Sequence, residues 1–329
     1  MSTLTATKPT LLDWAKFLDP DGKAAVVAEL LAQTNPILQD MVTVEANAPT
    51  FHRSSIRTGL PSATWRKLYK GVPVSKSTRA QVDDAIGMLH ARSEIDKDLA
   101  ELNGLTNQFR MDEASAFIES MNQTMATTLF YGDASTDPEK FTGLAPRYNS
   151  LSAGNAQNII DAGGTGSDNT SIWLIGWGKQ TIHGIFPKGS KAGLSQQDLG
   201  EIDCFDSDNN RYRGYAEIFN WKQGLVLKDW QYVVRICNID VSNLVAESSA
   251  ADLIKLMIKA QHRIKVPGLV NLSYYCNRTV AEMLDIQAQN KAAYTLTTGN
   301  DAFGRPVTMS RGIPIRACDA ILSTEARIT

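Results

Sequence analysis

The sequence has few cysteines, no targeting segment and no long apolar run. Its cysteines are too far apart to form the CxxC pairs of zinc and redox sites: Cys204, Cys237, Cys276 and Cys318. Because nothing at the N-terminus resembles a signal peptide, we expect reduced thiols in the core of a cytoplasmic product. No apolar run approaches the ~18–20 residues that span a bilayer, which excludes an integral membrane protein.

The chain also lacks a surplus of charge of either sign. Its 33 basic and 35 acidic residues give a formal net charge of −2. A dedicated duplex-DNA binder would carry a large positive field, so any contact with nucleic acid must be local. The apolar share of 43% and the length of 329 residues predict a folded chain with one large domain or two to three smaller ones.

Motifs for catalysis and metal binding are missing too. Gly178 and Lys179 lack the earlier glycine and the following hydroxyl of a phosphate-binding loop. Asp206 and Asp208 begin a calcium-loop pattern, but Arg211 stands where a tightly turning glycine is needed, which favours a simple turn. The four histidines have no partner at metal-ligand spacing. We therefore predict no cofactor, no metal and no enzymatic activity, with a dispersed active site as the open alternative.

One segment has a strongly uneven charge. Residues 46–82 contain no acidic side chain, and the charged residues within 83–101 are mainly acidic. The candidate basic interface residues are Arg53, Arg57, Arg66, Lys67, Lys70 and Arg79, and the candidate acidic ones are Asp83, Asp84, Glu94, Asp96 and Asp98. Strand-like runs at 50–58 and 79–86, separated by glycines and prolines, predict a long two-stranded finger.

A projecting two-stranded finger cannot bury an apolar face by itself. We therefore expect it to lie on a neighbouring copy, with its basic tip facing the acidic base of that copy, so that the charge reversal sets the register of assembly. The alternatives are a solvated basic loop and a nucleic-acid-binding finger in which Trp65 and Tyr69 stack on bases.

The remaining chain alternates between helical and strand-rich blocks, which predicts an α+β fold. A short helix over 11–18 has a wide apolar face that needs a partner, either its own subunit or a neighbour: Leu11, Leu12, Trp14 and Leu18. Residues 112–131 form the clearest long helix, and its outer face is polar but nearly uncharged, which suits burial against protein or in a core. Strands are expected at 172–178, 181–186, 215–221, 225–228 and 231–239.

This order of elements resembles the major capsid proteins of tailed phages with the Hong Kong 97 fold, in particular those of podoviruses of enteric bacteria and Bordetella. The local sequences that carry the resemblance are 137–144 (DPEKFTGL) after the long helix, 270–280 (VNLSYYCNRTV), and 312–316 (GIPIR) with 319–321 (DAI). The resemblance implies an N-terminal arm (1–45), an extended β-hairpin loop (46–95), a peripheral domain (96–246) with spine helix 112–131, an axial domain (247–304) and a closing strand (305–329).

The resemblance further implies a virion protein that assembles in the host cytoplasm into hexamers and pentamers of an icosahedral head around double-stranded DNA. Its expected partners are other copies of itself, a scaffolding protein, a portal protein, a cement protein and, through weak non-specific contact, the DNA. The alternatives are a nucleic-acid-binding protein that uses residues 46–82 and the shell of an encapsulin nanocompartment.

Overall fold

The fold is described from a computed structural model, in residues 8–11, 13, 32–206, 208–290, 297–300 and 306–329. The helices are α2 (Ile37–Asp40), α3 (Lys97–Ala100), α4 (Thr106–Tyr131), α5 (Val241–Val245), α6 (Leu253–Gln261) and α7 (Arg278–Asn290). The strands are β1 (Thr43–Glu45), β2 (Phe51–Gly59), β3 (Thr78–Asp96), β4 (Ile159–Asp161), β5 (Asn169–Trp177), β6 (Ile182–Phe186), β7 (Leu194–Phe205), β8 (Arg211–Leu227), β9 (Val233–Asp240), β10 (Asn271–Cys276), β11 (Thr297–Asn300), β12 (Pro306–Ser310) and β13 (Ile313–Ala317).

Short 3₁₀ turns complete the described elements: η1 (Leu102–Gly104), η2 (Ala145–Tyr148), η3 (Ala156–Asn158), η4 (Trp230–Tyr232) and η5 (Pro267–Leu269). All described strands belong to one connected sheet, in the order β11-β12-β13-β10-β5-β6-β8-β3-β2, with β1, β4, β7 and β9 joined at its sides. None of the described helices is long and apolar enough to cross a membrane.

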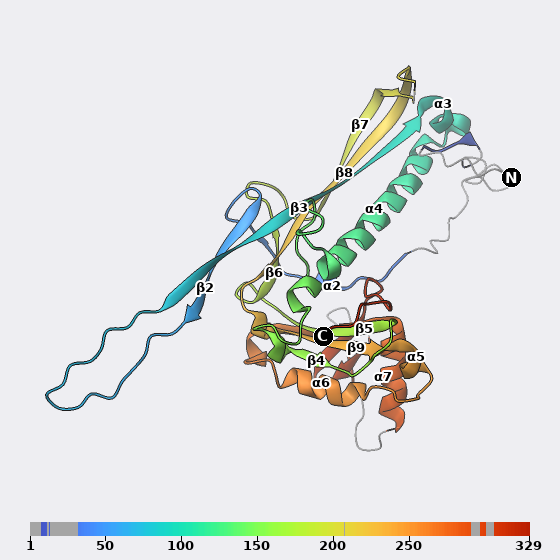
Figure 1. Cartoon of the computed structure of the whole chain (residues 1–329). Helices are drawn as coiled ribbons and strands as arrows, with labels where there is room; N and C mark the ends of the chain where they lie inside the picture. Colours follow the sequence, from blue (N-terminus) through green and yellow to red (C-terminus); the bar gives the residue numbers. More distant parts are fainter. Residues whose placement is uncertain (1–7, 12, 14–31, 207, 291–296, 301–305) are drawn as a thin grey trace.

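The molecule has a compact body, a long extension that contains α4, and a projecting hairpin (Figure 1). In the body, α5, α6 and α7 lie near β5 and β9, and in the extension α4 runs beside β3 and β8. The hairpin of β2 and β3 points away from both. The 19-residue strand β3 connects the parts, because its first half pairs with β2 (Phe51 opposite Ala85) and its second half with β8 (Ile86 opposite Gly224).

Strand β5 separates two hydrophobic cores. All nine of its residues are buried, and successive side chains point to opposite faces of a strand. Trp173 and Ile175 therefore join the core that contains Leu129 and Phe130 of α4, together with α2 and the C-terminal tail. Ile172 and Leu174 join the core formed with α5, α6 and α7. A strand that is buried on both faces explains the nearly continuous apolar run in its sequence.

The predicted long helix is confirmed, but it begins earlier than expected. Helix α4 starts at Thr106, six residues before the predicted start at 112. The added turns are held by tertiary contacts: Phe109 packs with Ile95 and Leu99 in a small core, and the Arg110 guanidinium lies 2.6 Å from Glu217 of β8. The sequence does not reveal such contacts, because Arg110 and its partner Glu217 are 107 residues apart.

The strand predictions were right in type, but they divided one strand and did not include β1, β4 or β7. Residues 215–221 and 225–228 were expected as separate strands, but 215–221 and 225–227 belong to the single strand β8. Gly224 does not break this strand; a Cβ there would lie 2.6 Å from the Ala85 carbonyl oxygen, so glycine permits β3 to approach. Strand β7 was not expected at all, because it is an edge strand whose polar residues are exposed on both faces and show no alternation.

Candidate inter-subunit surfaces

The hairpin ends in a long exposed tip. Strands β2 and β3 are antiparallel from Phe51 opposite Ala85 to Gly59 opposite Thr78, which confirms the predicted two-stranded finger. Residues 60–77 between them lie outside regular secondary structure, and every residue from 60 to 76 is exposed. Fully exposed apolar side chains include Trp65 at 102%, Tyr69 at 101% and Val74 at 100%, with Leu68 at 86%. The tip is therefore as apolar as it is basic.

The basic side chains named from the sequence are mostly unpaired within the chain. Arg57, Arg66, Lys67, Lys70 and Arg79 are exposed, and none has an ion pair with another described residue. Arg53 is the exception, because its guanidinium donates two hydrogen bonds of 2.7 Å to the Asp83 carboxylate across the hairpin. This pairing lowers the pKa of Asp83, because the guanidinium stabilises the carboxylate.

The acidic side chains named from the sequence mostly have partners in their own subunit. Besides Asp83, Asp84 is buried against Arg147 at 2.8 Å, and Glu94 lies 2.8 Å from both Lys8 and Arg92. Asp96 accepts a hydrogen bond from the Asp98 amide at 2.9 Å and so caps α3. Asp98 alone of this acidic set is exposed without an ion pair among the described residues. The structure thus brings the acidic residues to internal contacts and not to one docking surface.

Asp84 anchors the root of the hairpin to the body. Its partner Arg147 also donates to the carbonyl oxygens of Thr142 and Leu225, each at 3.1 Å. Asp84 is 4% exposed. The cluster therefore ties β3, β8 and the loop after α4 to one guanidinium.

Replacing Asp84 with alanine is expected to lower the free energy of unfolding by about 2 kcal/mol, because a charge-assisted hydrogen bond is lost and a largely buried guanidinium loses its counter-ion. Urea unfolding of the unassembled subunit measures this. Asp98→Ala is the matched control, since an exposed carboxylate without an ion pair should change stability by no more than about 0.5 kcal/mol. Equal midpoints for both variants would contradict the anchoring role.

The described part of the N-terminal segment contacts its own subunit. The Lys8 ammonium donates to the Tyr212 hydroxyl at 2.6 Å, and its pKa is raised mainly by its hydrogen bond with Glu94. Farther on, the Gln33 amide donates to Glu119 of α4 at 2.9 Å, and β1 pairs with β6. Leu11 is 69% exposed, whereas Leu12, Trp14 and Leu18 lie outside the described residues. Of the predicted docking face, only Leu11 is thus located.

The outer face of α4 is exposed in the subunit and is less polar than its sequence indicates. The hydroxyls of Thr124 and Thr128 donate back to the carbonyls of Ser120 and Thr124 at 2.9 and 2.7 Å. Ser115 likewise donates to the Asp112 carbonyl at 2.7 Å. Because these hydroxyls are already satisfied, the face presents methyl groups and few free donors, together with Ile118 at 38% exposure. Such a face can pack against protein at little desolvation cost.

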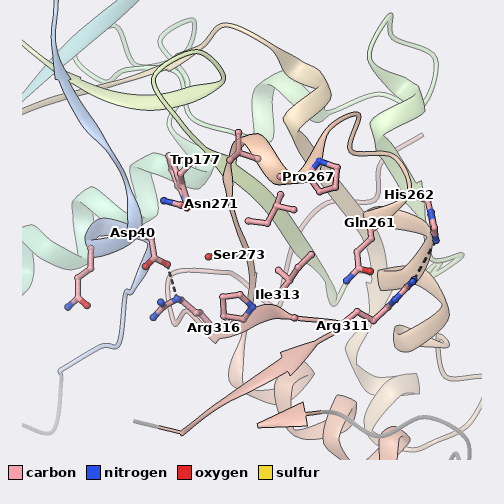
Figure 2. A pocket seen from close by; sticks show the side chains of 16 residues that line it. Asp40, Trp177, Gln261, His262, Pro267, Asn271, Ser273, Arg311, Ile313 and Arg316 are labelled. Carbon is pink, nitrogen blue, oxygen red and sulfur yellow. Dashed lines mark hydrogen bonds and ion pairs between the residues drawn. The ribbon is translucent and has the colours of Figure 1, made fainter. Parts of the chain in front are cut away.

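A cleft of about 1050 Å³ opens in the body where two strands diverge. Strand β10 pairs with β13 only from Tyr274 opposite Ile315 onward, so residues 271–273 leave a gap beside Ile313. Figure 2 shows Arg316 beside Asp40, at 2.9 Å, and Arg311 beside His262, at 3.5 Å, at its edges. No cluster of three metal-ligating side chains occurs among the described residues.

Sequence reasoning missed two features of these surfaces. Of the apolar side chains of the tip, only Trp65 and Tyr69 were considered, and only for stacking on nucleic-acid bases. The number of apolar side chains within 60–74 was visible in the sequence. Arg147 was not singled out, because nothing in its sequence neighbourhood indicates that Asp84, 63 residues away, is its partner.

Comparisons with known proteins find one family and several similar structures. The family model for the major capsid protein GP7 matches residues 19–329. A cryo-EM-derived chain of bacteriophage Epsilon15 is 35% identical, with 100% of this chain and 99% of that chain covered and a TM-score of 0.79. The capsid of an empty GTA particle is 10% identical, with 69% of this chain and 97% of that chain covered and a TM-score of 0.45. The SrpI encapsulin of Synechococcus elongatus is 9% identical, with 66% and 91% covered and a TM-score of 0.45. No curated protein matches the chain.

Proposed function

Since this chain belongs to the major capsid protein GP7 family and is the major capsid protein of a tailed phage, we propose that the hairpin tip and the outer face of α4 join its copies into the hexamers and pentamers of an icosahedral head. The predicted α+β fold of the Hong Kong 97 type and the predicted family are thereby confirmed. The protein is a component of the virion and assembles with itself.

The observation that carries the proposal is the exposed apolar tip. Six large apolar side chains within 60–74 are more than half exposed: Leu60, Trp65, Leu68, Tyr69, Val72 and Val74. Exposed apolar side chains in this number are typical of an interaction surface, and a two-stranded hairpin cannot cover them alone. Burying each side chain against a neighbour contributes roughly 1.5–3 kcal/mol. A second copy is the partner that a shell supplies to every subunit.

The charged residues of the tip supplement this apolar contact. Arg66, Lys67 and Lys70 have no ion pair among the described residues, so they are available to carboxylates of a neighbour. Complementary charge contributes orientation and association rate more than affinity. Within the set named from the sequence, Asp98 remains available as a carboxylate partner. The proposed register therefore depends on fewer charge pairs than the charge reversal of the sequence indicated.

We further propose the subdivision expected from the sequence: arm 1–45, loop 46–95, peripheral domain 96–246, axial domain 247–304 and closing strand 305–329. The partners proposed beyond the chain itself are a scaffolding protein, a portal protein, a cement protein and packaged double-stranded DNA. The net charge of −2 supports contact with DNA that is weak and non-specific. Assembly in the host cytoplasm, a podovirus virion and the absence of enzymatic activity belong to the same proposal.

Electron microscopy of the full-length protein, alone and with its scaffolding protein, tests the proposed function. We expect closed shells with hexameric and pentameric units. The competing function, nucleic-acid binding through residues 46–82, predicts instead a steep loss of DNA affinity with salt and no particles. The encapsulin alternative is not favoured, because the family match is to a phage capsid protein.

A further inference from the structure

Two histidines meet where the hairpin joins the body. His52 lies near the start of β2 and His183 in β6, with ring centroids 6.0 Å apart and an interplanar angle of 88°. His183 is completely buried, and neither of its ring nitrogens has a hydrogen-bond partner among the described residues. A buried polar group normally has such a partner, so two unsatisfied nitrogens on one side chain call for an explanation.

His52 accepts a hydrogen bond that only its neutral form can accept. Its Nδ1 accepts from the Asn47 backbone amide at 3.3 Å, which requires a ring without a proton at that nitrogen. The Asn47 side chain also holds the next residue, because it accepts from the Arg53 amide at 2.9 Å and donates to the Arg53 carbonyl at 2.8 Å. The turn that leads into β2 is thus built around an unprotonated His52, whose ring faces His183 of the body.

The charges around the pair disfavour protonation. Lys228, which follows β8, acts on both rings as a cation, and Asp84 of β3 acts on His52 as an anion. The charge of Asp84 is offset by Arg147 at 2.8 Å, and Asp229 beside Lys228 accepts from the Gln231 amide at 3.0 Å. Burial first, and then Lys228, lower the pKa of both histidines, and the pKa of His183 falls to about 4.

The hairpin root can separate from the body without breaking the main sheet. Strand β2 pairs only with β3, whereas β3 continues into the body beside β8. A crevice of about 610 Å³ already lies between β2 and residues 228–231, and His52 lines it. Water and protons can therefore reach His52 as β2 moves outward, and His183 becomes accessible behind it.

We propose that His52 and His183 form a pH-sensitive latch, which in its neutral form holds the hairpin root on the body and on protonation releases β2. Protonated His52 loses its acceptor bond with Asn47, and two imidazolium rings would stand 6.0 Å apart beside Lys228. When β2 is released, the two imidazolium charges move apart. The inference concerns a single subunit and stands independently of how copies assemble.

The direction of the pH effect follows from proton linkage. Above the ordinary histidine pKa of about 6.5, both rings are neutral in the closed and open forms, so the latch is fully stable. Below this pKa, the two histidines take up protons readily only in the open form. For His183 the equilibrium between open and closed forms therefore shifts up to tenfold per pH unit until about pH 4, where the closed form also binds the proton.

Hydrogen–deuterium exchange of the full-length, unassembled subunit between pH 7.5 and 4.5 tests the latch. After correction for intrinsic exchange rates, we expect protection of the Ala46 and Asn47 amides, within peptides covering 45–58, to fall by at least tenfold across this range, because these amides donate to Phe186 of β6 and to His52. Peptides covering β5 and β9 should keep their protection. Full protection of 45–58 at pH 4.5 would overturn the proposal, and so would a parallel loss in β5 and β9, because that is global acid unfolding.

Three variants separate the latch from general acid sensitivity. His183→Leu fills the apolar site without a titrating group and should remove most of the pH dependence at 45–58. His52→Gln cannot gain the imidazolium charge and should reduce it independently, even if the first variant fails to fold. His90→Gln, at an exposed position of β3, should leave the wild-type profile unchanged. A wild-type profile in both His183→Leu and His52→Gln would refute the latch.

Discussion

Replacing Glu325 with alanine is expected to lower the free energy of unfolding of the subunit by about 3–5 kcal/mol, the cost of leaving a buried charge without its partner. Glu325 and Arg235 are each 4% exposed at their side chains and lie 2.8 Å apart. Arg235 also donates to the Tyr148 carbonyl at 2.9 Å and lies 4.8 Å from the centre of the Trp173 ring. Without Glu325, this guanidinium would remain buried in the core.

The network around Glu325 also fixes the C-terminal tail. Its carboxylate accepts hydrogen bonds from the hydroxyls of Ser171 and Tyr131, and the Glu325 amide donates to the Asn169 carbonyl at 2.8 Å. Tyr131, at the end of α4, accepts in turn from the Leu322 amide at 3.0 Å. Burial and the nearby carboxylate raise the pKa of the Tyr131 phenol, so it remains a donor at neutral pH. The tail thus joins α4 to β5 and β9.

Urea unfolding of unassembled subunits, followed by circular dichroism, measures the loss. Glu325→Gln keeps an acceptor for the hydroxyls but removes the charge, so its stability should lie between those of the alanine variant and the wild type. Asp137→Ala removes half of an ion pair with Lys140 in which both side chains are at least half exposed, and should change stability by about 0.5 kcal/mol or less. If Glu325→Ala lowers the free energy of unfolding by less than about 1 kcal/mol, the ion pair of Arg235 and Glu325 is not fully buried.

Local patterns predicted the elements of this chain better than its long-range contacts. The hairpin, α4 and strands β5, β6 and β9 follow from periodicity and turn residues, which are local properties. The pair of Arg235 and Glu325 spans 90 residues, and no local signal marks either residue as buried. Strand β7 was missed because its pairing with β8 defines it, and this pairing is not visible in the sequence. Its exposed polar side chains resemble those of a loop.

The charge reversal near residue 83 also has a role within a single subunit. We expected the reversal to set the register between neighbouring subunits. In the structure, Arg53 faces Asp83 across β2 and β3, so an opposite-charge pair supports the register within one hairpin. Residues farther toward the tip have no such partner among the described residues. The sequence could not distinguish these two uses, because both place basic residues before acidic ones.

Truncation of the two tip aromatics in Trp65→Ala/Tyr69→Ala is expected to abolish shell formation at concentrations where the wild type assembles. Both side chains are fully exposed in the subunit, at 102% and 101%, so neither contributes to its folding core. Burial of each against a neighbour is worth roughly 2 kcal/mol, and the loss of both weakens each contact by about a thousandfold. A closed shell repeats that loss at every subunit. Sedimentation and negative-stain microscopy measure assembly, and unchanged urea unfolding confirms an intact subunit.

Comparison with Arg66→Glu/Lys67→Glu separates apolar from electrostatic docking at the same tip. Exposed ion pairs contribute about 0.2–1 kcal/mol each and are screened by salt, so the charge reversal should impair assembly less and chiefly at low ionic strength. Ser62→Ala, at an exposed tip position, is the matched control and should assemble normally. If the charge reversal prevents assembly at every salt concentration while the aromatic truncation does not, charge drives docking, and the apolar side chains of the tip have another role.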